Sequence, residues 1–436
     1  MTGTPEELTD LTGYQIVIPS NASETAVELV AYELKEYLAT KGYNLSVVKD
    51  SVSASVKEIL IGDTNRNTAV MPSDLAYAIY RDSNSKIQIA ASSSYGYEAA
   101  LSYIQAKGGI PQKTSKTGNA ELLSMKKADD SIRVMYYNNY LYQQAGRADG
   151  APEALTNELQ ADIFEAYAPD VIGFQEFRNL TVRADMKAKL EALGYTYVDV
   201  EDEVVASGDY LSINDTPIFY NGSKLTLLAS GYHLYSRKMN TNFQVDANGT
   251  LNINNNDSKS LTWAVFQVKE TGKQFAVLST HFIHDYSESL GNYAGAANAA
   301  RVIDAKEVLQ VVNQIKALKN GAYKNIPMVF GGDLNTKLGT DPINTLTTGG
   351  FALARDMAAA DDAIYDTYGG KGYSTYDTEK KVFSNIRDVA TTDTGIDHIL
   401  FENEEKVTVE KYLTLTNKIA RIPSDHPLKL VDFVID

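Results

Sequence analysis

The sequence predicts an α/β protein in which a small α/β domain precedes a larger one. Strand-like apolar runs alternate with segments whose apolar residues recur at helical spacing. Residues 110–130 are polar and contain Pro and Gly, as expected of a connection between domains. The 436 residues also exceed the usual size of one domain. We expect residues 1–12 to be a disordered N-terminus, residues 13–125 to form the small domain and residues 131–436 the large one.

The composition limits the classes of partner. Asp and Glu total 56 against 40 Lys and Arg, which gives a net charge of −16. So acidic a chain argues against broad electrostatic capture of nucleic acid or of an anionic membrane, although a local basic groove stays open. The absence of cysteine excludes disulfides, thiolate metal sites and cysteine nucleophiles. The sequence indicates no partner protein.

The location of the protein is inferred from its first residues and its composition. The segment MTGTPEELTD has neither the basic nor the apolar region of a signal peptide. No apolar run is long enough for a transmembrane helix. The many Tyr, Asn, Ser and Thr residues and the lack of cysteine favour the mature form of an exported bacterial protein, either secreted or at the cell surface.

The small domain is predicted to begin with a strand that is followed by a helix. In that helix Val27, Val30, Leu34 and Leu38 recur at helical spacing, and Gly42 stands where a C-terminal cap is expected. The later apolar runs are short or alternating and are bounded by turn residues, which is typical of strands. The predicted elements are a strand at 14–19, a helix at 23–42, strands at 45–49 and 57–62, a hairpin at 76–92 and a helix at 95–109.

This order of elements, with the turn IGDTNR at the end of the strand at 57–62, resembles a known accessory domain. It is the small α/β domain that precedes the catalytic barrel in bacterial hexosaminidases and glucuronidases. The resemblance covers about 110 residues and implies no catalytic role. Within the turn, Asp63 and Arg66 are expected to serve turn geometry.

The large domain carries polar residues at or near the ends of its apolar runs. These runs are 132–139, 171–174, 217–221, 261–268, 275–281, 326–336, 395–401 and 422–435, with a helical stretch before 171 and a polar loop or hairpin at 240–260. Their polar residues are Asn138 and Asn139, Gln175 and Glu176, Thr280 and His281, Asp333 and Asn335, Asp397, and Asp425 and His426. Several such strand ends can meet at one cleft. Oxygen ligands there suit Mg²⁺ or Mn²⁺ rather than zinc, and two histidines with a carboxylate suit phosphoryl chemistry.

The ordered set YNN, QEF, STH, GGDLN, IDHI and SDHP resembles the motif series of the endonuclease/exonuclease/phosphatase superfamily, which includes deoxyribonuclease I. The match spans nearly all of 131–436. It implies a four-layer α/β sandwich, with two packed mixed β-sheets flanked by helices. It also implies a metal-dependent hydrolase that cleaves a phosphodiester or phosphomonoester by in-line attack of water. The substrate would be a nucleic acid, a phospholipid head group or a small phosphoester.

The same resemblance implies a metal site. Glu176 would bind the ion, and Asn138 and Asp425 would complete or support the site. The expected ion is Mg²⁺ or Mn²⁺, with Ca²⁺ as a further candidate.

Five further residues would act on the phosphate. By resemblance, Asp333 and Asn335 position the attacking water and a phosphate oxygen, and His281 donates to the phosphoryl group. His426 would be held by Asp397, as a histidine is held by a carboxylate in a catalytic triad. Either Asp333 or His426 would remove the proton from water.

The chain departs from the family pattern at two cationic positions. Arg301 is followed by Asp304 where the family usually has Gln, and Lys259 stands where an Arg usually precedes the TW strand. We expect His284, Arg178 and Arg301 to contact substrate.

Two other functions are compatible with parts of the sequence. A catalytically silent binding protein could keep the fold, but it would be expected to lose some of the polar residues that this chain retains. A glycan-active hydrolase with paired carboxylates would fit the first domain and would need no metal. The GGDLN and SDHP motifs have no role in that second scheme.

Overall fold

The computed structural model describes residues 7–67, 72, 76–82, 86–112, 115–120, 127–140, 150–178, 180–208, 212–238, 244–245, 251–252, 258–284, 296–358, 374–386 and 395–436. The chain forms two compact units. The accessory unit comprises Met1–Met125, Ala145–Tyr167 and Tyr373–Ile386. The sandwich unit comprises Lys126–Gln144, Ala168–Gly372 and Arg387–Asp436. No helix among the described residues is long and apolar enough to cross a membrane.

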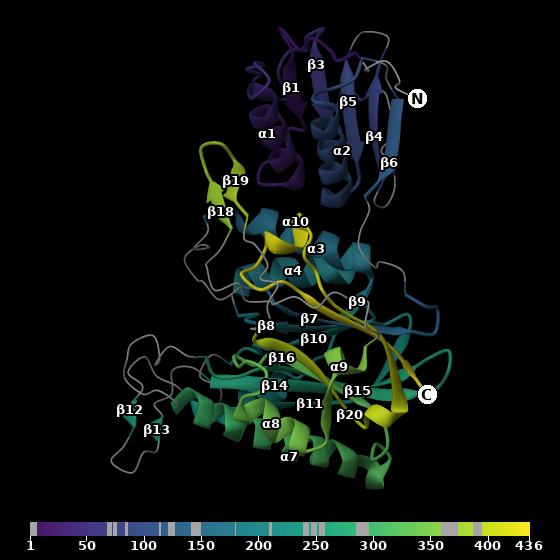
Figure 1. Ribbon diagram of the computed structural model, residues 1–436, viewed down its shortest axis with the longest axis vertical. Coiled ribbons are helices and arrows are strands. Elements are labelled where there is room, and N and C mark those ends of the chain that lie inside the picture. Colours follow the sequence, from purple (N-terminus) through teal and green to yellow (C-terminus); the bar gives the residue numbers. More distant parts are fainter. Residues whose placement is uncertain are drawn as a thin grey trace. The chain divides into compact units, whose positions relative to one another are not determined.

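The accessory unit is built on a six-stranded sheet of order β2–β1–β3–β5–β4–β6 (Figure 1). Its first four strands in that order are parallel, and β4 and β6 are antiparallel to their neighbours. Helices α1 and α2 bury their apolar positions, among them Leu34 and Leu101, in one core with the sheet. The bounds are β1 Gln15–Ile18, α1 Ala26–Ala39, β2 Val47–Lys49, β3 Glu58–Ile61, β4 Ala76–Arg81, β5 Ile87–Ala91, α2 Ser94–Lys107 and β6 Ser115–Asn119.

Two segments from later in the chain complete the accessory unit. Helix α3 (Glu153–Tyr167) places two carboxylates, one turn apart, at the N-termini of the other helices. Glu158 Oε2 accepts from the Ala26 N–H at 3.2 Å, and Asp162 Oδ2 accepts from the Ser94 N–H at 2.6 Å. Negative charge at these positions favours both helices, because a helix N-terminus has unpaired N–H groups and a partial positive charge.

The second of these segments is the hairpin of β18 (Thr375–Asp377) and β19 (Val382–Asn385). Between its strands, Lys381 Nζ lies 2.9 Å from Oε1 of Glu28, a buried carboxylate on α1. This ion pair anchors the hairpin to the first helix of the unit.

Two expectations for the accessory unit differ from the structure. Residues 115–119, expected in the connection, form β6 and pair with β4, because backbone hydrogen bonds at a sheet edge do not require apolar side chains. Of the expected disordered N-terminus, residues 1–6 lie outside the described residues. Residues 7–12 are ordered, since Leu11 is buried and the Thr9 N–H donates to the Ile110 carbonyl at 2.8 Å.

The sandwich unit contains two six-stranded mixed sheets. The first has the order β21–β22–β7–β8–β10–β9, and the second has the order β11–β14–β15–β16–β20–β17. Among the described strands of these two sheets, β7 with β8 and β15 with β16 are the parallel pairs. The strands are β7 Ile132–Asn138, β8 Val171–Gln175, β9 Tyr195–Tyr197, β10 Ile218–Asn221, β11 Leu225–Lys238, β14 Ser258–Val268, β15 Gln274–His281, β16 Met328–Asp333, β17 Phe351–Leu353, β20 Asp397–Glu402, β21 Val407–Thr414 and β22 Lys429–Ile435. A short β12–β13 pair (Gln244–Val245 and Leu251–Asn252) lies in the expected loop or hairpin.

The two sheets pack face to face through one apolar core. Val134, Phe266, Val329 and Phe433 meet in it from both sheets. The Tyr136 hydroxyl on the first sheet lies 3.0 Å from the Val329 carbonyl on the second. The two sheets approach so closely here that a Cβ atom at position 331 would lie 2.7 Å from the Tyr136 ring. Glycine at position 331 avoids this clash.

Helices cover the outer faces of the two sheets. Helices α7 (Ala296–Gly321, with regular geometry lost from Leu318) and α8 (Asp341–Thr348) share a core with the second sheet. Helix α4 (Leu180–Ala192) contacts β9 of the first sheet, and α4 and α7 lie on opposite sides of the sandwich unit in Figure 1. The other helices in the described part of the chain are α5 Glu201–Ser207, α9 Ala354–Met357, η1 Glu404–Lys406 and α10 Lys418–Arg421. The predicted α/β sandwich of two packed mixed sheets is confirmed.

Candidate active site

Strand register brings the predicted site residues to one edge of the sandwich unit. The parallel pairs β7–β8 and β15–β16 end together, so that Asn138 lies opposite Gln175 and His281 lies opposite Asp333. Strand β20 runs antiparallel to β16 and begins where β16 ends, which sets Asp397 opposite Asp333. Backbone pairing therefore brings Asn138 to Gln175 in the first sheet and joins His281, Asp333 and Asp397 in the second. Face-to-face packing of the two sheets brings these two groups together.

Two site residues have left-handed backbone conformations that residues other than glycine rarely adopt. Glu176 has φ 61° directly after β8, and Asn335 has φ 49° two residues after β16. Asn335 is held by its N–H, which donates to Asp333 Oδ1 at 2.9 Å, and by its side-chain amide, which donates to the Phe282 carbonyl at 2.9 Å. Such strain persists where surrounding contacts enforce it and is concentrated at functional sites.

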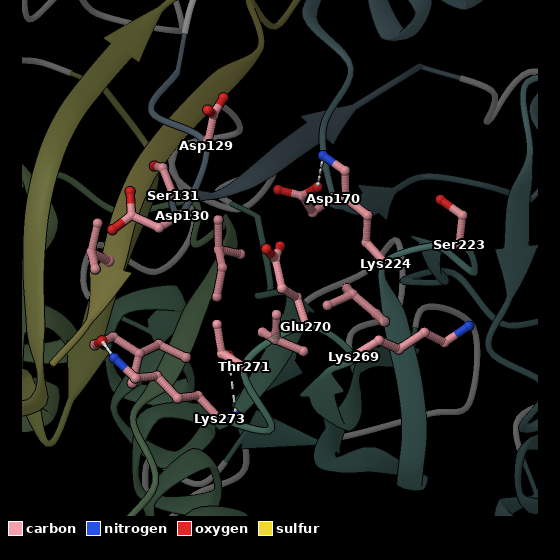
Figure 2. Close-up of a pocket in the computed structure, with 15 residues that line it drawn as sticks. Asp129, Asp130, Ser131, Asp170, Ser223, Lys224, Lys269, Glu270, Thr271 and Lys273 are labelled. Atoms are coloured by element: carbon pink, nitrogen blue, oxygen red, sulfur yellow. Dashed lines mark hydrogen bonds and ion pairs between the residues drawn. The ribbon is translucent and has the colours of Figure 1, made fainter.

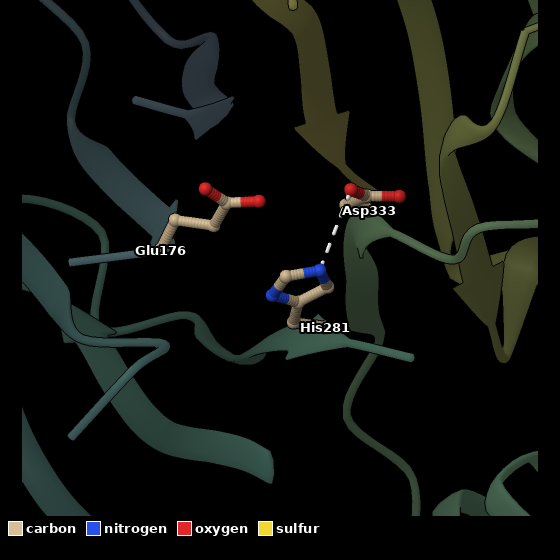
Figure 3. A group of neighbouring side chains, drawn as sticks. All are labelled: Glu176, His281 and Asp333. Carbon is tan, nitrogen blue, oxygen red and sulfur yellow. Dashed lines mark ion pairs between the residues drawn. The ribbon is translucent and has the colours of Figure 1, made fainter. Parts of the chain in front are cut away.

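Glu176, His281 and Asp333 form a group that could hold a metal ion. One ligand atom from each lies within 4.8 Å of the others. Figure 3 shows the three side chains pointing toward a common space. The Asn138 side-chain amide donates to both carboxylates, at 3.1 Å to Glu176 Oε1 and 3.0 Å to Asp333 Oδ2. Its own oxygen accepts from the Tyr140 N–H at 3.2 Å, so Asn138 supports the group as a donor.

The electrostatics of this group fit a hard divalent cation. Burial raises the pKa of Glu176, His281 lowers it in part, and the nearby charge of Asp425 raises it again. Burial and the Asp397 charge likewise raise the pKa of Asp333. Carboxylates that repel one another in a dry site are stabilised by a bound cation, and their oxygen atoms suit Mg²⁺ or Mn²⁺.

A second group is formed by Asp333, Asp397 and His426. Asp397 Oδ2 lies 2.9 Å from Nδ1 of His426, and Nε2 of the ring faces Asp333 Oδ2 at 3.9 Å and Asp425 Oδ1 at 4.0 Å. Burial lowers the pKa of His426, but Asp397, Asp425 and Asp333 outweigh it and raise the pKa well above its ordinary value. The Ser424 hydroxyl accepts from the His426 N–H at 3.0 Å and donates to the Asn138 carbonyl at 2.6 Å. It thereby ties the loop of His426 to the end of β7.

His281 is held by a carboxylate that the sequence analysis did not single out. Asp215, just before β10, places Oδ2 3.0 Å from Nδ1 of His281, and Nε2 of the ring faces Asp333 Oδ2 at 3.5 Å. Arg178 pairs with the other oxygen of Asp215, and Lys259 Nζ lies 3.3 Å from both ring nitrogens. Burial raises the pKa of Asp215, but Arg178, His281 and Lys259 hold it well below the usual range. Asp215 is therefore a carboxylate at neutral pH.

A weak signal for Asp215 is present in the sequence. Asp215 stands just before the apolar run 217–221, whereas most of the other site residues stand at the end of an apolar run. The contact with His281 spans 66 residues, and no local pattern links the two.

The three residues expected to contact substrate are two buried arginines and one half-buried histidine. Arg178 is 7% exposed and is held by Asp215. Arg301 is 4% exposed and donates to the carbonyl oxygens of Asn335 and Ile283. Both guanidinium groups thus support residues of the site, and their contacts with substrate stay predictions. His284 is half-buried, three residues after His281.

A pocket of about 420 Å³ lies at the other end of β7, around Ser131 and Ile132 (Figure 2). Its buried carboxylate, Asp170, accepts from the Arg133 N–H at 2.8 Å and lies 3.1 Å from Lys224 Nζ. These partners give Asp170 a structural role, and the pocket lacks the two histidines that lie at the opposite strand ends.

The model of the endonuclease/exonuclease/phosphatase family matches residues 144–426. No curated protein matches the chain. Among solved structures, an endonuclease/exonuclease/phosphatase family protein from Bacteroides thetaiotaomicron is 20% identical, with a TM-score of 0.48, over 70% of this chain and 98% of that one. The mannosyl-6-phosphatase of B. thetaiotaomicron VPI-5482 has the same identity and TM-score over 70% and 100%. TDP2 of D. rerio with a single-strand DNA product is 15% identical, with a TM-score of 0.46, over 70% and 99%.

Proposed function

Because the chain belongs to the endonuclease/exonuclease/phosphatase family, we propose that it is a divalent-metal-dependent hydrolase of phosphoesters. The observation that carries this proposal is the convergence of Glu176, His281, Asp333 and the Asp397–His426 pair at one edge of the sandwich unit. The bond cleaved is a phosphodiester or a phosphomonoester, and water attacks phosphorus in line with the leaving oxygen.

The metal would be held by Glu176 and Asp333, with Asp425 beside them, and Mg²⁺ or Mn²⁺ suits these oxygen ligands. When bound, it would neutralise charge on the phosphoryl oxygens and on the leaving oxygen. Asn138 keeps the two carboxylates in place through its two hydrogen bonds.

The residues around Asp333 bind and orient the reacting groups. Asp333 lies between the two histidines, 3.5 Å from Nε2 of His281 and 3.9 Å from Nε2 of His426. In the proposed mechanism, Asp333 and Asn335 position the water and a phosphoryl oxygen. His281 donates a hydrogen bond to the phosphoryl group, while Asp397 fixes the ring of His426 by its Nδ1 atom. The strained backbone of Asn335 fits such a positioning role.

The substrate class and the setting of the enzyme are further parts of the proposal. A small phosphoester fits the net charge of −16 better than a long nucleic acid, because polyanions are captured by basic surfaces. The resemblance of the first domain to glycosidase accessory domains would fit a substrate in which phosphate is linked to a glycan. From its composition, we propose that the enzyme is exported from a bacterial cell.

The test is hydrolysis of bis(p-nitrophenyl) phosphate and of p-nitrophenyl phosphate, each with Mg²⁺, with Mn²⁺ and with excess chelator. We expect release of p-nitrophenol that requires metal, and the ratio of diester to monoester cleavage identifies the bond class. No release from either ester, nor from a panel that includes DNA and sugar phosphates, would favour a binding protein of the same fold.

A further inference from the structure

Arg183, in the first turn of α4, bonds to the two loops that carry Glu176 and Asp215. Its Nη1 atom donates to the Phe177 carbonyl at 3.2 Å and to the Asn214 carbonyl at 2.8 Å. Phe177 directly follows Glu176 in the sequence. Asn214 directly precedes Asp215. One guanidinium group therefore joins the backbone beside a proposed metal ligand to the backbone beside the carboxylate of the second loop.

The two loops lie side by side because β8 and β10 are antiparallel neighbours in the first sheet. The Phe177 N–H donates to the Asp215 carbonyl at 3.2 Å, which continues the pairing past the strand ends. Side chains then add two further links. Arg178 pairs with the Asp215 carboxylate, and Arg183 bridges a carbonyl oxygen of each loop.

The contacts of Phe177 help to hold Glu176 in its left-handed conformation, which has φ 61°. A conformation of this kind persists where neighbouring contacts enforce it. The Phe177 N–H is held by Asp215 and its carbonyl by Arg183, and its side chain is fully buried. Loss of Arg183 would release the carbonyl and allow the backbone at Glu176 to relax.

The guanidinium group of Arg183 is itself held in one place. Its Nη2 atom donates to the Tyr197 hydroxyl at 3.0 Å and to Oε1 of Glu201 at 2.7 Å. Its Cζ atom lies 5.3 Å from the centroid of the Phe177 ring, and the side chain is 12% exposed. A cation that is bonded on both sides and lies against an aromatic ring has little freedom to move, so it can fix the two carbonyl groups.

The place of Arg183 in α4 is unfavourable for the helix. It is the fourth residue of α4, and the first turn of this helix contains no acidic residue. A cation near a helix N-terminus meets the partial positive charge of the helix. Helix stability therefore does not account for an arginine at this position, whereas its bonds to the two loops do.

We infer that Arg183 is a positioning residue of the proposed reaction. It acts through the peptide groups next to Glu176 and Asp215, and so sets the first carboxylate for the metal and the second for His281. The inference rests on the proposed function and deepens it. Because Arg183 bonds to the backbone beside these residues, its loss should lower kcat and metal affinity and leave KM for the ester nearly unchanged.

The first variant is Arg183→Met, which keeps a long apolar side chain and removes the hydrogen bonds to both loops. We expect kcat on the best ester and the affinity for Mn²⁺ each to fall about tenfold, the lower end of the range for outer partners of metal sites. The matched control is Lys187→Met. Lys187 is a cation one turn later on α4, with Nζ 4.6 Å from the Tyr197 ring centroid, and this variant should keep the wild-type values.

The second variant, Arg183→Lys, separates charge from bridging. Its single ammonium group keeps the charge but cannot reproduce the planar fork that contacts both loops and Tyr197. We expect kcat between those of the wild type and Arg183→Met. We also expect Arg183→Met combined with Asp215→Asn to lower kcat by less than the product of the two single effects, because both changes act on the orientation of His281.

Titration calorimetry with Mn²⁺, without ester, gives a readout that does not depend on catalysis. If no ester is cleaved but Arg183→Met weakens Mn²⁺ binding, the phosphoesterase proposal fails and the positioning role stands. If folded Arg183→Met and Arg183→Lys keep the wild-type kcat and Mn²⁺ affinity, the inference is overturned, even if both variants unfold at a lower temperature. That last result would give Arg183 a role in stability alone.

Discussion

The Oδ2 atom of Asp215 lies 3.0 Å from Nδ1 of His281, and both side chains are buried. A carboxylate at Nδ1 fixes the orientation of the ring and turns Nε2 toward the site, as outer partners of metal-site histidines commonly do. Here Nε2 faces Asp333 at 3.5 Å. The orientation of His281 therefore depends on a residue from the other sheet of the sandwich, just before β10.

Asp215→Asn should lower kcat about tenfold to 100-fold, the range typical of outer partners at metal sites. The amide removes the charge that Arg178 and His281 share, and the ring loses its fixed orientation. Steady-state kinetics on the best ester would measure the effect, with Asp185→Asn as the control on a surface helix. Full activity in Asp215→Asn would show that this contact has no catalytic consequence.

His426→Ala should lower turnover by about 10²–10⁴-fold, as loss of a proton-transfer or charge-stabilising group does. Its Nε2 atom faces two carboxylates of the site, and Asp397 holds the opposite nitrogen. Circular dichroism would establish that the variant stays folded. An unimpaired His426→Ala enzyme would remove this residue from the mechanism.

The free energy of unfolding should fall as the pH is lowered from about 6.5 to about 4, because His398 is buried in its neutral form. Burial lowers the pKa of His398 to about 4, and its Nε2–H donates to the Thr336 carbonyl at 2.8 Å. The folded state thus binds fewer protons than the unfolded state between the unfolded pKa near 6.5 and pH 4, so stability rises with pH in that window. The full contribution is about 3 kcal/mol, by the conversion of about 1.4 kcal/mol per pKa unit. Denaturant unfolding at pH 4.5 and 7 should show a smaller difference in His398→Gln than in the wild type, and equal differences would contradict this role.

Asp162→Ala should destabilise the accessory unit by about 0.5–2 kcal/mol, the usual cost of losing a helix cap. Its carboxylate accepts from the Ser94 N–H at the start of α2. Hydrogen exchange of α2 amides is the measurement, and Glu165→Ala on the exposed side of α3 is the matched control. Exchange that is unchanged in Asp162→Ala and in the double variant with Glu158→Ala would show that α3 does not cap this unit.

The sequence predicted the parts of the site that local patterns encode. Apolar runs that end in polar residues placed Glu176, His281 and Asp333 at strand ends. Parallel pairing of β15 with β16 then brought His281 to Asp333, and packing of the two sheets brought Glu176 to both. It did not predict β6, because the segment SKTGN is polar and pairs only through its backbone.

Long-range contacts were also missed. Helix α3 lies between β7 and β8 in the chain, so sequence order assigns it to the sandwich. The contacts that bind it to the accessory unit are made by Glu158 and Asp162 with helices 132 and 68 residues away. The Asp215–His281 pair is of the same kind, since no periodicity predicts a contact between a loop residue and the end of a distant strand.

Glu176 and its neighbours are proposed to hold a catalytic divalent cation. The most direct measurement is ester hydrolysis as a function of Mg²⁺ concentration after chelation, for the wild type, Glu176→Gln and the surface control Glu191→Gln. We expect activity to vanish with chelator and to return with added metal. We expect the Mg²⁺ concentration for half-maximal activity to be at least about tenfold higher in Glu176→Gln, because loss of even an outer partner of a metal site typically lowers metal affinity about tenfold. Hydrolysis that persists in chelator, or a Glu176→Gln titration that coincides with the wild type, would contradict the claim.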